Sequence, residues 1–163
     1  MHKLFIAFLS LLLLYSCSNS ETSPGNEEKK NGENKVPVPD HDYSGCYIRV
    51  LQRDTLVAHL QQNGKDFKGK LTFDNYEKDG SSGTITGKLE NGIIKLLYRF
   101  QSEGMNSVME VYFQASDSAI IPGTGDIRNN RDTVFFKNPS DLNFAEKDKL
   151  RKTNCDDLPS KYR

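Results

Sequence analysis

The feature that most constrains the fold is a period-two alternation of apolar and polar residues, which repeats between turn signals from about residue 44 to residue 137. This alternation is typical of strands that have one face in a core and the other in water. It predicts strands at about 45–51, 55–62, 67–73, 82–89, 93–101 and 107–114, and weaker ones at 119–122 and 133–137. The chain therefore has about eight short strands.

The connections favour antiparallel pairing of consecutive strands. Asn63-Gly64 and Asn91-Gly92 each separate two strand-like stretches, and Asn-Gly is typical of tight hairpin turns. Each strand has one apolar face, so all must share one core, and a sheet that closes on itself leaves no unpaired edge. We therefore expect an all-β fold, a small up-and-down antiparallel β-barrel, with a two-sheet β-sandwich as the alternative.

The inward faces contain both bulky residues and glycines. The bulky ones favour a filled interior, with partners bound at the rim or outside: Phe73, Leu96, Tyr98, Phe100, Met109 and Phe113. Gly69, Gly83 and Gly87 indicate either barrel curvature or bulges, or tight packing against a neighbouring aromatic ring. The sequence leaves these two readings open.

The alternation stops after Asn138-Pro139. Asn143 and Glu146 have the spacing of a helix capping box, and Arg151 and Lys152 would lie in the last turn. We therefore expect one short helix over about 144–151, in a C-terminal extension of the barrel domain at 43–163.

The N-terminus carries a short apolar segment, Leu4–Tyr15, which is interrupted only by Ser10 and preceded by Lys3. Its 12 residues would span about 18 Å as a helix, whereas a membrane span needs about 30 Å. A basic start, a short apolar stretch and then small residues are typical of an export signal.

The end of this segment, Leu14-Tyr15-Ser16-Cys17, resembles the lipobox of bacterial lipoproteins. The resemblance implies that residues 1–16 are a signal peptide, that cleavage precedes Cys17, and that Cys17 carries the lipid. Two or more acyl chains anchor a protein stably. No Asp follows Cys17, so the inner-membrane retention signal of that family is absent, and we expect attachment to the outer membrane, on either face. The stretch Ser18-Asn19-Ser20-Glu21, followed by Glu27-Glu28, resembles the acidic segments after the lipidated cysteine of Bacteroidota surface lipoproteins.

Residues 17–42 are expected to form a disordered tether. From Ser18 to Asp42 the only apolar residues are Val36 and Val38, which is too little apolar surface to offset chain entropy. The whole chain has 22 basic and 22 acidic residues. Nucleic-acid binding relies on a basic surplus, so we expect no nucleic-acid partner.

Two cysteines remain after Cys17. Cys46 lies in the first predicted strand and Cys155 in the C-terminal extension, and an even pair in an oxidising compartment predicts a disulfide. A catalytic thiol or a metal pair is less well supported, because His59 is the only histidine within the domain.

Catalytic motifs are missing from the sequence. There is no Gly-x-Ser-x-Gly motif and no phosphate-binding loop before a helix, so we expect no enzyme activity, no metal and no cofactor. Carboxylate pairs such as Glu103 and Asp126 leave a hydrolase of envelope polymers as an alternative.

Binding residues are expected near the loop at 101–106, because loops held by a rigid scaffold often carry binding. The candidates are Tyr98, Arg99, Glu103 and Met105. An outward basic stripe is either a solvated face or a surface for anionic glycans or lipid headgroups: Lys68, Lys70, Lys88, Lys95 and Arg99.

Together these features predict a membrane-anchored, non-catalytic binding module. The predicted barrel resembles calycin-type folds, which bind apolar molecules or act as inhibitors, although the chain has no Trp and so lacks the lipocalin Gly-x-Trp signature. The expected partners are an envelope protein, a glycan or a small apolar ligand. The alternative to a binding module is an assembly accessory of an outer-membrane complex, with Ile93 and Leu97 as outward apolar residues.

Overall fold

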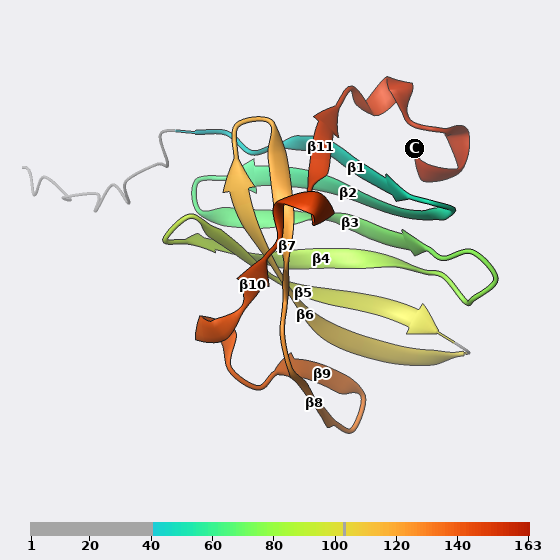
Figure 1. Cartoon of the computed structure of the whole chain (residues 1–163), viewed down its shortest axis with the longest axis vertical. Helices are drawn as coiled ribbons and strands as arrows, with labels where there is room; N and C mark the ends of the chain where they lie inside the picture. Colours follow the sequence, from blue (N-terminus) through green and yellow to red (C-terminus); the bar gives the residue numbers. More distant parts are fainter. Residues whose placement is uncertain (1–40, 103) are drawn as a thin grey trace, which may run out of the picture. The chain divides into compact units, whose positions relative to one another are not determined.

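The chain folds into a closed eight-stranded antiparallel β-barrel (Figure 1), seen in a computed structural model that describes residues 41–102 and 104–163. The predicted signal peptide, Cys17 and the predicted disordered tether up to residue 40 lie outside the described residues. The barrel strands are β1 (Gly45–Leu51), β2 (Asp54–Asn63), β3 (Asp66–Asp74), β4 (Ser81–Glu90), β5 (Ile93–Ser102), β6 (Met105–Ser116), β7 (Ala119–Thr124) and β11 (Leu150–Thr153). The predicted all-β barrel is confirmed.

Strand β11 closes the barrel. It pairs antiparallel with β1 through Cys46–Ile48 and with β7 through Ala119 and Ile120. The remaining strands are β8 (Ile127–Asn130), β9 (Thr133–Phe136) and β10 (Asn143–Phe144). Four 3-10 turns complete the described chain: η1 (Pro139–Asp141), η2 (Glu146–Asp148), η3 (Cys155–Asp157) and η4 (Ser160–Tyr162). Within the described residues, no helix has the length and apolar character needed to cross a bilayer.

The predicted helix over 144–151 is wrong. Only η2 is helical there, and the residues that flank it, Ala145 and Lys149, have extended backbone angles. The segments on either side form β10 and β11, so their backbone groups bond to other strands rather than within a helix. Leu150 is fully buried in the barrel core. This burial of an apolar side chain further stabilises the strand over the helix that the local sequence favours.

The barrel interior follows the predicted alternation. Apart from the glycines, the residues expected to face inward on 67–73, 82–89, 93–101 and 107–114 belong to one core cluster or pack against it. The largest fully buried side chains are Tyr47, Tyr98 and Phe113. Tyr47 donates its hydroxyl hydrogen to the carbonyl of Tyr43, and burial raises the pKa of Tyr47 to about 12. The centre of the barrel is therefore filled with side chains.

The inward glycines allow adjacent strands to approach closely. A Cβ atom added at Gly69 would overlap the carbonyl oxygen of His59, and at Gly87 it would overlap that of Lys95. At Gly83 an added Cβ atom would overlap the carbonyl oxygen of Arg99. Because the nearest atoms are backbone atoms of the next strand, the structure supports the curvature reading over packing against an aromatic ring.

The predicted disulfide between Cys46 and Cys155 is confirmed. It joins residues 109 positions apart, with 5.2 Å between their Cα atoms. It holds the C-terminal tail, residues 154–163, against the outside of the barrel. Leu158 and Tyr162 of the tail pack there on Cys46, Val57 and Ile48, forming a second apolar cluster.

Candidate ligand-binding site

The barrel wall is incomplete beside β6. This strand has 12 residues, whereas β7 has six and β11 has four. Residues 113–116 of β6 pair with β7, while Val108 and Met109 pair in parallel with β9. Residues 110–112 of β6, which lie between these two stretches, have no partner strand on this side within the described chain.

A cleft of about 310 Å³ occupies this part of the barrel. Inward-facing side chains of the barrel strands form one wall: Leu56, Phe73, Met109, Val111 and Phe113. The other residues that line it are Pro122, Gly123 and Thr124 of β7, Phe136 of β9, and the charged residues Arg49, Glu110 and Asp148. The cleft therefore has a mostly apolar wall and three charged groups.

Arg49 links β1 to η2 across the cleft. It shares the inward face of β1 with Tyr47 and stands opposite Leu56 in the register with β2. Its Nη1 donates to Asp148 Oδ1 over 2.9 Å, and the two side chains are 24% and 22% exposed. Arg49 Nε is buried and has no acceptor among the described residues. A buried donor without a partner costs about 1–3 kcal/mol, so an acceptor on a ligand would be stabilising here.

Glu110 is the third charged residue that lines the cleft. Its Oε2 accepts a hydrogen bond from the backbone N–H of Phe136 over 3.1 Å, which holds β9 against β6. The ring of Phe136 also packs edge-on against Tyr112, with centroids 5.5 Å apart. Burial raises the pKa of the Tyr112 hydroxyl.

Aromatic rings pack in the barrel interior beside the cleft. Tyr98 stacks on Phe100 with ring centroids 4.6 Å apart, and it lies 5.7 Å from the ring of Phe73, which lines the cleft. The Tyr98 hydroxyl donates to Ser81 Oγ over 3.0 Å. Burial raises the pKa of Tyr98, so this hydroxyl stays a neutral donor. The aromatic stack is a rigid support for the wall of the cleft.

Three of the four binding residues predicted from sequence are described, and they occupy different environments. Tyr98 is fully buried in the core, whereas Arg99, its neighbour on β5, is exposed on the outer face and donates to Thr86 Oγ1 over 3.2 Å. Met105 is 66% exposed at the start of β6. Glu103 lies outside the described residues. Of the three described residues, none lines the cleft, so a binding loop at 101–106 stays a prediction.

The outward basic stripe is partly neutralised. Lys88 pairs with Asp66 over 3.3 Å, and Lys95 pairs with Glu90 over 2.5 Å. Lys68 and Lys70 instead line a groove of about 600 Å³ that is formed by β2, β3 and β4 together with Tyr162 and Arg163 of the tail. The charge of the stripe is therefore less concentrated than its sequence indicates, and this favours a solvated face.

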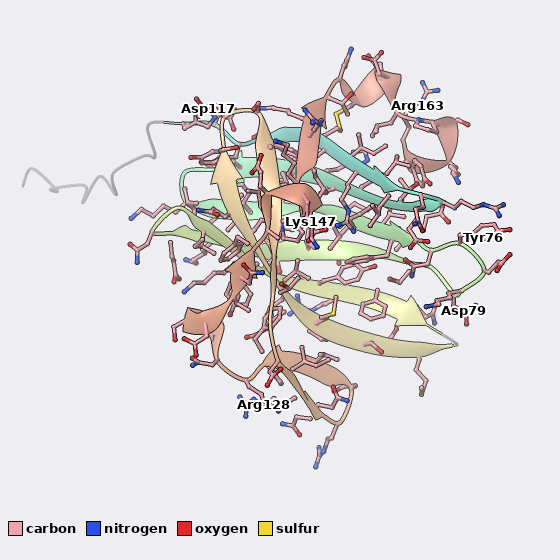
Figure 2. All side chains as sticks on the ribbon, in the orientation of Figure 1. Tyr76, Asp79, Asp117, Arg128, Lys147 and Arg163 are labelled. Carbon is pink, nitrogen blue, oxygen red and sulfur yellow. A yellow bond between two sulfur atoms is a disulfide. The ribbon has the colours of Figure 1, made fainter. Side chains whose placement is uncertain are left out.

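Large exposed apolar side chains lie elsewhere than predicted. Ile93 and Leu97 are half-buried. Val50, Leu51, Tyr76 and Met105 are exposed, in or beside the turns that follow β1, β3 and β5. Figure 2 shows Tyr76 in the loop after β3, at one end of the barrel. These residues give that end an apolar rim.

The sequence carries one overlooked signal for the cleft. Arg49 occupies an inward position two residues after Tyr47, so a charge interrupts an apolar face. Asp148, its partner, lies 99 residues away and was part of the predicted helix. The alternation could identify Arg49 as unusual, but it could not identify the partner.

The comparisons with known proteins add no relative. No protein-family model matches the chain, and no curated protein and no solved structure matches it either.

Proposed function

We propose that this chain is an exported, lipid-anchored envelope protein whose β-barrel binds a small, mainly apolar ligand without catalysing its conversion. The observation that carries the proposal is the cleft of about 310 Å³ beside β6. Small-molecule sites have volumes from about 300 to 1,000 Å³, mostly apolar walls and a few polar groups, and they often lie at the ends of β-barrels. The filled centre of the barrel leaves this cleft as the best-supported site.

The charged groups of the cleft define the polar part of the ligand. Arg49 offers its Nε–H to an acceptor, while Asp148 and Glu110 give the cleft one net negative charge. This negative charge would repel a ligand carboxylate, whereas it would not repel a neutral carbonyl or hydroxyl group in the same way. The favoured ligand is therefore a neutral amphipathic molecule, with its apolar part against Phe73, Met109 and Val111.

A binding assay with N-phenyl-1-naphthylamine, a neutral apolar fluorophore, tests the site. We expect fluorescence to rise when the fluorophore binds, and the Val111→Phe variant to lose most of this rise because the new ring fills the cleft. Leu97→Phe is the matched control, since it adds a ring on the outer face of β5. Equal binding by Val111→Phe and the unchanged protein would exclude the cleft as the site.

A hydrolase remains the second candidate, because two carboxylates, Glu110 and Asp148, line the same cleft. Both are already engaged, by the backbone of Phe136 and by Arg49, which favours a binding role. Release of reducing ends from envelope glycans by the unchanged protein, lost in Glu110→Gln, would support the hydrolase instead.

Lipid attachment is tested separately at Cys17. We expect mass spectrometry of the mature protein to find an acylated N-terminal Cys17, and the protein to fractionate with the outer membrane. Cys17→Ser removes the sulfur that carries the diacylglycerol, so this variant should leave the membrane fraction or keep residues 1–16. An unacylated, full-length chain recovered from the cytosol would contradict the proposal.

A further inference from the structure

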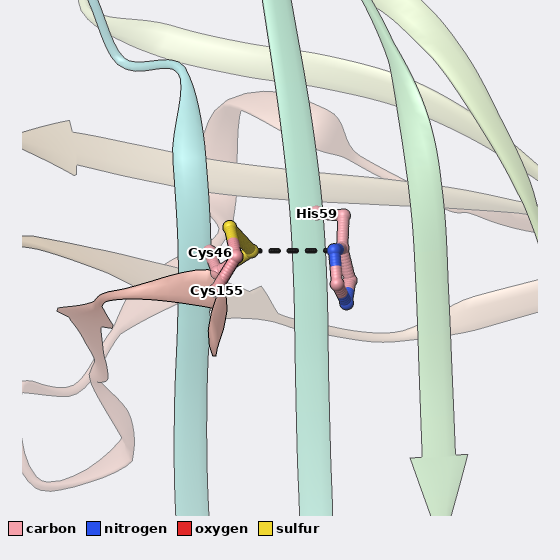
Figure 3. A group of neighbouring side chains, drawn as sticks. All are labelled: Cys46, His59 and Cys155. Atoms are coloured by element: carbon pink, nitrogen blue, oxygen red, sulfur yellow. Dashed lines mark hydrogen bonds between the residues drawn. A yellow bond between two sulfur atoms is a disulfide. The ribbon is translucent and has the colours of Figure 1, made fainter. Parts of the chain in front are cut away.

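We propose that the Cys46–Cys155 disulfide is a thiol-exchange centre, in which Cys155 accepts an external thiol and Cys46 is the leaving sulfur, assisted by His59. Figure 3 shows the three side chains together, with the dashed line from His59 to Cys46. The donor atoms of the three residues lie within 4.8 Å of one another. The inference concerns the outer face of the barrel and does not depend on the ligand cleft.

The two sulfur-bearing residues differ in accessibility. Cys46 is 1% exposed in β1 and packs against Val57 and Leu158. Cys155 is exposed, at the start of η3. Thiol–disulfide exchange requires a thiolate to reach one sulfur of the disulfide. The attack is therefore directed to Cys155, and this choice makes Cys46 the leaving group.

His59 lies next to the leaving sulfur. It stands directly opposite Cys46 in the register of β1 with β2, and its Nδ1 is 3.2 Å from Cys46 Sγ. Its Nε2 is 2.7 Å from the carbonyl oxygen of Tyr162. A carbonyl only accepts hydrogen bonds, so Nε2 carries a hydrogen and donates it. This contact orients the ring and turns Nδ1 toward the sulfur.

The tail holds this arrangement in place. Tyr162 is buried against the barrel, and its hydroxyl donates to Asp74 Oδ2 over 2.5 Å. Lys161 Nζ binds the same carboxylate oxygen over 2.6 Å. These contacts do not involve the disulfide, so Tyr162 keeps the His59 ring oriented after the sulfur–sulfur bond opens.

The exchange step balances without a separate oxidant. A lone pair of the external thiolate forms a new bond to Cys155 Sγ, and the electron pair of the old bond moves to Cys46 Sγ. The Cys46 thiolate then accepts a hydrogen bond, or the proton itself, from Nδ1 of protonated His59. One disulfide is consumed and one mixed disulfide is formed. A neighbouring protonated histidine stabilises a thiolate, and a more stable thiolate leaves faster.

Peptide mapping of the oxidised chain tests which sulfur is attacked. The protein is treated with glutathione, free thiols are blocked with iodoacetamide, and the products are identified by mass spectrometry. We expect glutathione on Cys155 and the blocking group on Cys46. Glutathione on Cys46, or an equal mixture of the two products, would overturn the proposal.

Rate measurements test the role of His59. We expect His59→Ala to slow mixed-disulfide formation about three- to tenfold. His41→Ala is the matched control, because that ring contacts Tyr43 and Asp117 instead, and it should react at the unchanged rate. His59→Gln keeps an amide donor for the Tyr162 carbonyl but cannot take up a proton, so a fold defect can be separated from a chemical one.

The pH dependence gives a readout that a purely structural histidine would not change. The rate constant per attacking thiolate should rise on acidification in the unchanged protein, because protonated Nδ1 is the assisting form. It should stay constant in His59→Ala and His59→Gln. Equal rates and equal pH profiles in all variants, with circular dichroism confirming their folds, would overturn the role of His59.

Discussion

At the scale of single residues, glycine determines how tightly the barrel wall bends. Gly87 lies so close to the carbonyl oxygen of Lys95 that an added methyl group would force the two strands apart. We expect Gly87→Ala to lower the free energy of unfolding in urea by about 1–3 kcal/mol. Gly125→Ala is the control, because its methyl would meet only the side-chain ends of Leu142 and Phe136. Equal losses in both variants would contradict this account.

Asp74 makes docking of the tail dependent on pH. The hydrogen bond from Lys161, followed by that from Tyr162, lowers the pKa of the Asp74 carboxyl from 3.8. A folded-state pKa below the unfolded value stabilises the fold above that range, and this stabilisation is lost as pH falls through the folded value. We expect the protection of residues 158–163 against hydrogen exchange, relative to the intrinsic rate at each pH, to fall below pH 3.8, and Asp74→Asn to be less protected already at neutral pH. A tail whose exchange keeps the same acid dependence in Asp74→Asn would rule out this residue as the cause.

At the scale of elements, the sequence predicts what is local and misses what is distant. The strands β1 to β6 follow from their alternation and from the Asn-Gly turns, because each strand is long enough to show its buried face. The segment 143–153 has capping-box spacing, but its strands obtain their hydrogen bonds from β1 and β7. Two and four residues are too few for an alternation to be recognised. The cleft was missed for the same reason, since Asp148 meets Arg49 only in the closed barrel.

The disulfide stabilises the element that closes the barrel. Cys46 is paired with Thr153 of β11, and Cys155 lies two residues further along. Cross-linking residues 109 positions apart stabilises a fold by about 4–5 kcal/mol in the chain-entropy model. We expect this loss of unfolding free energy in the Cys46→Ser, Cys155→Ser double variant. Reduced unchanged protein separates loss of the bond from substitution of the buried Cys46, and a loss below about 1 kcal/mol in both would contradict the expectation.

At the scale of the whole molecule, the described barrel combines a filled centre with a cleft beside β6. Long strands from the first two thirds of the domain supply most of the wall, and short strands from its last third cover only part of the remaining gap. The Arg49–Asp148 pair lines the cleft. In the proposed binding site, we therefore expect ligand preference to depend on residues that are far apart in sequence, through the charge balance of Arg49, Asp148 and Glu110.

Asp148→Asn tests this charge balance. The variant removes the net negative charge of the cleft and leaves Arg49 without its carboxylate, so a ligand carboxylate should take that place. We expect the unchanged protein to prefer a medium-chain alcohol over the fatty acid of equal length, in competition with the fluorophore. Asp148→Asn should shift this preference toward the acid about tenfold, or about 1.4 kcal/mol. Asp66→Asn removes an exposed carboxylate that pairs with Lys88 instead, and it should leave the preference unchanged. If the preference shifted equally in both variants, the overall charge of the protein would be its cause. That result would contradict a role for Arg49 in ligand binding.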